Sequence, residues 1–88
     1  MDKTMNLIPI PARARLFLRD KLEKLNIEFF LYRFDEPRQE NIPLPVCTLH
    51  GEEFSGNKVS YIESKLSKEE IFNLIEEIED EHGWKFTS

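Results

Sequence analysis

The sequence predicts a single α/β (α+β) domain over residues 1–88, with a small mixed sheet of about four strands and two main helices. Two segments, 12–25 and 67–82, repeat apolar residues at the spacing of a helix that covers a core. Short apolar runs bounded by proline, glycine or polar residues lie before and between them, as is typical of strands. Eighty-eight residues are the length of one domain.

Composition and charge narrow the classes of function. The chain has one cysteine, which excludes an internal disulfide and fits a reducing compartment, so we expect a cytoplasmic protein. No apolar run approaches the ~20 residues that cross a membrane, and the first residues lack a secretory-signal pattern. The net charge of the chain is −5, and residues 67–81 account for it, because seven acidic residues there accompany Lys68 alone, a net of −6. We therefore expect neither membrane binding nor direct binding to nucleic-acid phosphates.

The N-terminal part predicts a strand followed by a helix. Residues 3–10 form the strand, which Pro9 and Pro11 are expected to end because proline cannot donate to a sheet ladder. Pro11 suits the first turn of the helix over 12–25, and Asn26 is its expected stop. The apolar stripe of this helix is formed by Ala14, Leu18, Leu22 and Leu25, with Phe17 beside it.

Residues 27–34 predict a strand whose two faces are both apolar. Ile27, Phe29 and Leu31 point one way, and Phe30, Tyr32 and Phe34 point the other. Apolar residues on both faces indicate a sheet that is covered on both sides. The polar residues 35–43, which include two prolines, predict a loop.

Residues 42–56 predict a hairpin that two prolines precede. Pro43 and Pro45 lead into the apolar run 46–49, a turn at 50–52 follows, and a second run ends at Phe54. The Leu44–Pro45 bond is a candidate cis peptide. Residues 58–62 predict another strand or the far end of the hairpin.

Residues 67–82 predict the second helix. Ser67 and Glu70 have the spacing of a capping box, and Gly83 is the expected end. The apolar stripe is formed by Ile71, Leu74, Ile75 and Ile78. Trp84 and Phe86 are expected to fold back onto the core or to add an edge strand.

Segments of this chain resemble the glutaredoxins, which have the thioredoxin fold. Residues 8–18 are similar to the family's Cys-Pro-Tyr-Cys-x-x-Ala-Lys-x-Leu-Leu region, and residues 44–56 are similar to its Val-Pro hairpin with spaced glycines. Residues 66–71 look like the start of the last helix of a thioredoxin. The resemblance implies a minimal thioredoxin-like fold in which the hairpin is central.

The resemblance also implies a redox-inactive member of this family. The family's two cysteines fall on Ile8 and Pro11, and neither residue can attack or resolve a disulfide. No catalytic residue, metal or cofactor is therefore expected. We expect a small regulator or adaptor that binds another protein along an extended ledge. The ledge residues are Ile8, Pro9, Ile10, Pro11, Leu44 and Pro45.

Two alternative functions remain open. The first is an acidic inhibitor or nucleic-acid mimic that acts through residues 69–81. The simpler interpretation of these residues, Glu79 included, is a solvated helix face. The second is a glutaredoxin-type thiol oxidoreductase that uses Cys47. The simpler interpretation of Cys47 is a buried and inert cysteine. The residues of the acidic face are Glu69, Glu76, Glu77, Asp80 and Glu81.

The remaining polar candidates have simpler interpretations. His50 is interpreted as a surface turn residue and His82 as a helix-end residue, because a metal site needs further ligands at suitable spacing. Three arginines, at positions 13, 15 and 19, form either a solvated helix face or a small patch for an anion or a partner. The sequence predicts neither the identity of the partner nor the oligomeric state.

Overall fold

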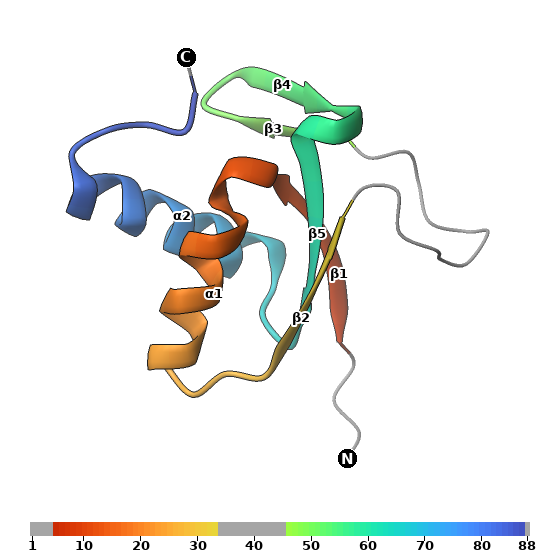
Figure 1. The fold of residues 1–88 in the computed structure, drawn as a ribbon, viewed down its shortest axis with the longest axis vertical. Helices are drawn as coiled ribbons and strands as arrows, with labels where there is room; N and C mark the ends of the chain where they lie inside the picture. The colour runs from red at the N-terminus through yellow and green to blue at the C-terminus, as the bar shows by residue number, and fades with distance from the viewer. Residues whose placement is uncertain (1–4, 34–45, 88) are drawn as a thin grey trace.

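The computed structural model of this chain describes residues 5–33 and 46–87 (Figure 1). Its elements are, in order, β1 (Asn6–Pro11), the short 3₁₀ helix η1 (Ala12–Ala14), α1 (Arg15–Lys24), β2 (Phe29–Arg33), β3 (Val46–Leu49), β4 (Glu52–Ser55), the 3₁₀ helix η2 (Gly56–Lys58), β5 (Val59–Ser64) and α2 (Lys68–His82). The predicted α+β class and both main helices are confirmed. Within the described ranges, neither helix is long and apolar enough to cross a bilayer.

In the described part of the chain, the main sheet has three strands in the order β1-β5-β2. Both β1 and β2 pair with β5 in antiparallel register, so they run parallel to each other on either side of it. This is a split β-α-β arrangement, in which α1 carries the chain past the inserted strand. Figure 1 shows the sheet on one side and both helices on the other. The segment predicted at 58–62 is thus the middle strand of the sheet, not the far end of the hairpin.

The hairpin β3–β4 forms a separate two-stranded sheet. Leu49 pairs with Glu52, which leaves His50 and Gly51 as the connecting loop. Both loop residues have positive φ, 53° and 82°, as a type I′ turn requires. The predicted strand and turn are confirmed, but the hairpin is not the centre of the main sheet as the resemblance implied. Residues 34–45, including Leu44 and Pro45, lie outside the described residues.

The first strand continues through both of its prolines, contrary to the expectation that they end it. Among residues 5–33 and 46–87, β1 pairs with β5 alone and is an edge strand. Pro9 and Pro11 are two residues apart, so their nitrogens face the same edge of the strand. Proline is tolerated in an edge strand, where its missing N–H can lie on the side turned away from the neighbouring strand. Pro11 is the last residue of β1 and not the first residue of the helix, and α1 begins only after η1.

The core lies between the helices, the covered face of the main sheet and the hairpin. It includes Leu18 and Leu22 of α1, Ile71, Ile75 and Ile78 of α2, Ile10 and Ile62 of the sheet, and Leu49 and Phe54 of the hairpin. Leu25 was predicted to join the apolar stripe but is 50% exposed. It follows the last turn of α1, and Asn26 then leaves the helix with a φ of 62°.

The second face of the main sheet is covered in part, because Tyr61 of β5 is buried there while Phe30 of β2 is half exposed. Phe30 is 49% exposed, whereas Phe29 and Leu31 pack against the core. Leu31 shares its face with Ile8 and Ile62 through the strand register. The described helices lie against that face alone (Figure 1).

Both ends of α2 follow the predicted signals. Ser67 Oγ accepts from the Glu70 N–H at 3.1 Å, and Glu70 Oε1 accepts from the Ser67 N–H at 2.8 Å. Gly83 ends the helix with a φ of 77°. The chain then folds back, and Phe86 becomes part of the core. The fold-back alternative is confirmed for the described part of the tail, which contains no strand.

Candidate functional site

The outer face of α2 carries a row of exposed carboxylates. Glu69, Glu76 and Asp80 are spaced by seven and four residues, which places them on one stripe of the helix. The opposite stripe, Ile71, Ile75 and Ile78, is buried. We call the three carboxylates the acidic row. Packing of the apolar stripe against the core is what turns the acidic row to the outside.

A second acidic stripe of α2 is already engaged with α1. Lys21 Nζ lies 2.7 Å from Glu81 Oε2 and 3.3 Å from Glu77 Oε1. The hydrogen bond with Glu81 raises the pKa of Lys21, and the same bond lowers the pKa of Glu81. Glu77 and Glu81, both predicted for the acidic face, therefore have their charge partly neutralised within the fold.

The acidic row differs from that stripe in its partners. Across residues 5–33 and 46–87, no cation forms an ion pair with Glu69, Glu76 or Asp80. Glu69 lies in the first turn of α2, where the helix dipole favours negative charge, while Asp80 lies near the other end, where it does not. Three carboxylates thus project to solvent without an internal counter-charge from the described residues.

Glu79 does not belong to a solvated face, which corrects its interpretation from the sequence. Its side chain has no exposed surface. Its Oε1 lies 2.7 Å from His50 Nε2, and its Oε2 accepts the Phe86 N–H at 2.9 Å. Burial of an unpaired carboxylate is costly, and these partners satisfy both oxygens. The sequence did hold a signal, since Glu79 lies four residues after Ile75 on the apolar side of the helix.

His50 is consequently more than a surface turn residue, because it joins the hairpin loop to α2. His82 lies elsewhere, stacked on Trp84 with ring centroids 5.3 Å apart. Phe17 of α1 meets both rings edge-on. The structure does not bring the two histidines together, and in its described part no three acidic, histidine or cysteine side chains are grouped as a metal site would need.

The predicted ledge is largely part of the core. Ile8, Ile10 and Pro11 are buried, because the covered face of β1 and its last residue pack inward. They offer a partner no surface, and Pro9 alone among the four is partly exposed. Leu44 and Pro45 lie outside the described residues. Three of the four described ledge residues therefore provide no docking surface.

Cys47 lies on the inner side of β3 and is buried. Burial raises the pKa of its thiol to about 11, although the positive charge of Lys68 opposes the shift. The thiolate is the reactive form of cysteine, so this thiol is almost entirely unreactive at neutral pH. The geometry supports the interpretation of Cys47 as a buried hydrophobe.

The three arginines of the first helical segment have different surroundings. Arg13 donates from Nη1 to the carbonyl oxygen of Phe86 at 3.3 Å and so holds the C-terminal tail. Arg19 pairs with its neighbour Asp20 at 3.3 Å. Arg15 is partly buried. They do not act as one uniform solvated face.

Comparison of the chain with protein-family models, with curated proteins and with solved structures gives no match.

Proposed function

We propose that this protein is a non-catalytic protein-binding module that presents the acidic row of α2 to a basic surface of another protein. The observation that carries the proposal is the contrast along α2. Glu77 and Glu81 are paired with Lys21, and Glu79 is buried with His50, whereas the acidic row has no described counter-charge. Three carboxylates without a described counter-charge thus lie together on one outward stripe of α2.

The dimensions of the row suit a protein surface. Glu69 and Asp80 are eleven residues apart, which corresponds to about 16 Å along a helix. A row of fixed negative charge attracts a basic partner and repels nucleic-acid phosphates. Exposed charges of this kind increase the rate and the specificity of association more than its final affinity.

The acidic inhibitor or nucleic-acid mimic is a special case of the same proposal. A row of carboxylates on a helix presents several fixed negative charges along a line, as a strand of nucleic acid does. In that case the basic partner is itself a nucleic-acid-binding protein. Duplex DNA would then displace the module from its partner, whereas it would leave the complex with another basic protein intact.

A redox role is not favoured by the surroundings of Cys47. Its burial and raised pKa support a redox-inactive module, as the resemblance to glutaredoxins implied. The membership of that family and the cytoplasmic location remain predictions from the sequence. The proposed docking surface is on α2 and not on the ledge, because Ile8, Ile10 and Pro11 are buried.

Charge reversal on α2 tests the proposal. The immobilised chain and its E69K/E76K/D80K variant are used to capture partners, which are identified by mass spectrometry and then bound as purified proteins. The matched control is E23K/E28K/E53K, which makes the same charge change at exposed positions outside α2. We expect the control to retain the partner, and the α2 variant to lose it. Equal binding by both variants, or affinity that does not fall as salt is raised, would refute the proposal.

A further inference from the structure

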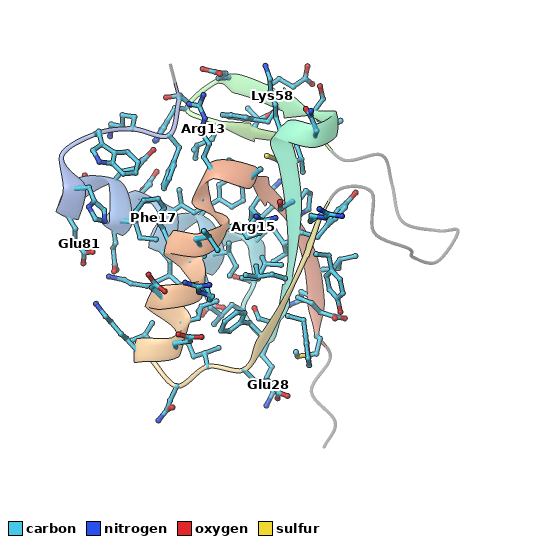
Figure 2. The ribbon with its side chains drawn as sticks, in the orientation of Figure 1. Arg13, Arg15, Phe17, Glu28, Lys58 and Glu81 are labelled. Carbon is cyan, nitrogen blue, oxygen red and sulfur yellow. The ribbon has the colours of Figure 1, made fainter. Side chains whose placement is uncertain are left out.

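A pocket of about 240 Å³ lies where β1 and β5 meet the hairpin. It is lined by Ala12 and Arg13 of η1, Glu52 and Phe54 of β4, and Asn57 and Lys58 of η2. Strand register explains why these distant segments meet. Pro11 pairs with Val59, so the residues that follow Pro11 lie beside the residues that precede Val59. Figure 2 shows Arg13 and Lys58 at the same end of the molecule, next to the hairpin.

The polar lining of the pocket is rich in hydrogen-bond donors. Arginine has five N–H donors, of which Arg13 gives one to the Phe86 carbonyl oxygen, and that bond fixes the position of the guanidinium. The ammonium of Lys58 and the amide of Asn57 add further donors from η2. Two cations thus accompany one carboxylate, Glu52, so the pocket is locally positive on a chain whose net charge is −5.

The remaining lining is apolar. Phe54, which is buried against the core, and Ala12 supply the apolar part of the lining. Small-molecule sites combine apolar walls with a few convergent polar groups. The volume is below the ~300 Å³ at which typical ligand pockets begin, so the occupant must be small.

We infer that this pocket binds a small organic anion, with one oxyanion group held by Arg13, Asn57 and Lys58 and an apolar body placed against Phe54. Guanidinium and ammonium groups bind carboxylate and phosphate oxygens through charge-assisted hydrogen bonds. Glu52 limits the ligand to a single anionic group, since a second would lie near its carboxylate. This inference does not depend on the proposed function of α2, which lies on a different element.

Amide chemical shifts of the ¹⁵N-labelled full chain provide the test. The probes are phenyl phosphate, benzoate, inorganic phosphate and the neutral benzyl alcohol. We expect saturable shifts at the amides of Arg13, Phe54 and Lys58 with phenyl phosphate or benzoate, and the tighter of the two identifies the preferred oxyanion. Inorganic phosphate and benzyl alcohol should bind at least roughly tenfold more weakly, since each lacks one half of the recognition.

Variants separate the pocket from general ionic attraction. R13Q and K58Q should each weaken binding roughly tenfold, and E52Q should strengthen it severalfold. R19Q removes an exposed arginine outside the pocket and should leave binding unchanged. K58Q removes no contact that holds the tail, so it keeps the test valid if R13Q loosens Phe86. The inference is overturned if no probe gives saturable shifts, if K58Q binds as the wild type does, or if R19Q weakens binding equally.

Discussion

His50 Nε2 lies 2.7 Å from Oε1 of Glu79, a residue 29 positions later in the chain. This contact joins the tip of the β3–β4 hairpin to the last turns of α2. The other oxygen of Glu79 holds the Phe86 N–H, so one carboxylate connects the hairpin, the helix and the tail. These three parts form the end of the molecule that carries the pocket of Arg13 and Lys58.

Removal of this carboxylate should destabilise the protein. In Glu79→Ala, His50 and the Phe86 N–H lose their acceptor and a buried space remains. We expect a loss of about 2–3 kcal/mol in the free energy of unfolding. Urea denaturation measures it, with Glu76→Ala on the exposed stripe as control, which should change stability by less than about 0.5 kcal/mol. Similar losses in both variants would mean that the buried contact does not stabilise the fold.

Cys47 should make the protein less stable in alkaline solution. Its folded pKa of about 11 lies above the ordinary value of 9.0, so the folded state holds the proton more tightly than the unfolded state. The stabilisation is complete below pH 9 and is lost as the pH rises towards about 11. Denaturation of wild type and Cys47→Ala between these pH values checks this, because the variant should lack the cysteine-dependent part of the fall. Rapid reaction of the native thiol with a disulfide reagent at pH 7 would contradict its burial.

The ion pair between α1 and α2 should be visible in the titration of Glu81. The hydrogen bond from Lys21 holds the pKa of this carboxyl below its ordinary value of 4.5. Its contribution to stability is therefore present above that value and is lost as the pH falls through the folded pKa. In Lys21→Met the NMR titration midpoint of Glu81 should rise, whereas in Lys65→Met, outside both helices, it should not move. An unchanged midpoint in Lys21→Met would show that the pair does not persist in solution.

Truncation of two phenylalanines should cost very different amounts of stability. Phe86 is buried, and its ring lies 4.8 Å from Trp84 and 5.6 Å from Phe17, centroid to centroid. Phe86→Ala should cost about 3–5 kcal/mol of unfolding free energy. Phe30 is half exposed, so Phe30→Ala should cost much less, and the pair forms its own control. Comparable losses would indicate that the open face of β2 is covered in solution.

Local signals in the sequence predicted much of the fold. The capping box of Ser67 and Glu70, the stop at Gly83 and the hairpin turn each depend on neighbouring residues, and each was found. The order of the sheet was not predicted, because the pairing of β5 between β1 and β2 is set by contacts between residues far apart in the chain. Pro9 and Pro11 misled the strand assignment for the same reason, since their effect depends on which edge of β1 is paired.

The candidate site was predicted only in part. Charge counting located the acidic residues of α2 but could not separate Glu79, whose partner His50 is supplied by another element. Lys21 of α1 was also not anticipated as a partner. It pairs with Glu77 and Glu81, so these carboxylates differ from those of the acidic row, which have no described counter-charge. The pocket needed the register of β1 and β5, which brings η1 and η2 together.

The prolines of β1 have a consequence for growth of the protein into fibres. Copies of the protein can add to one another as a continuous sheet only if both edge strands have free N–H donors for the next strand. Along β1, positions 9 and 11 have no such donor, so an incoming strand finds two gaps in the ladder that it would have to form. β1 therefore contributes to the core through its inner face, and its two prolines disfavour the addition of further strands at its edge.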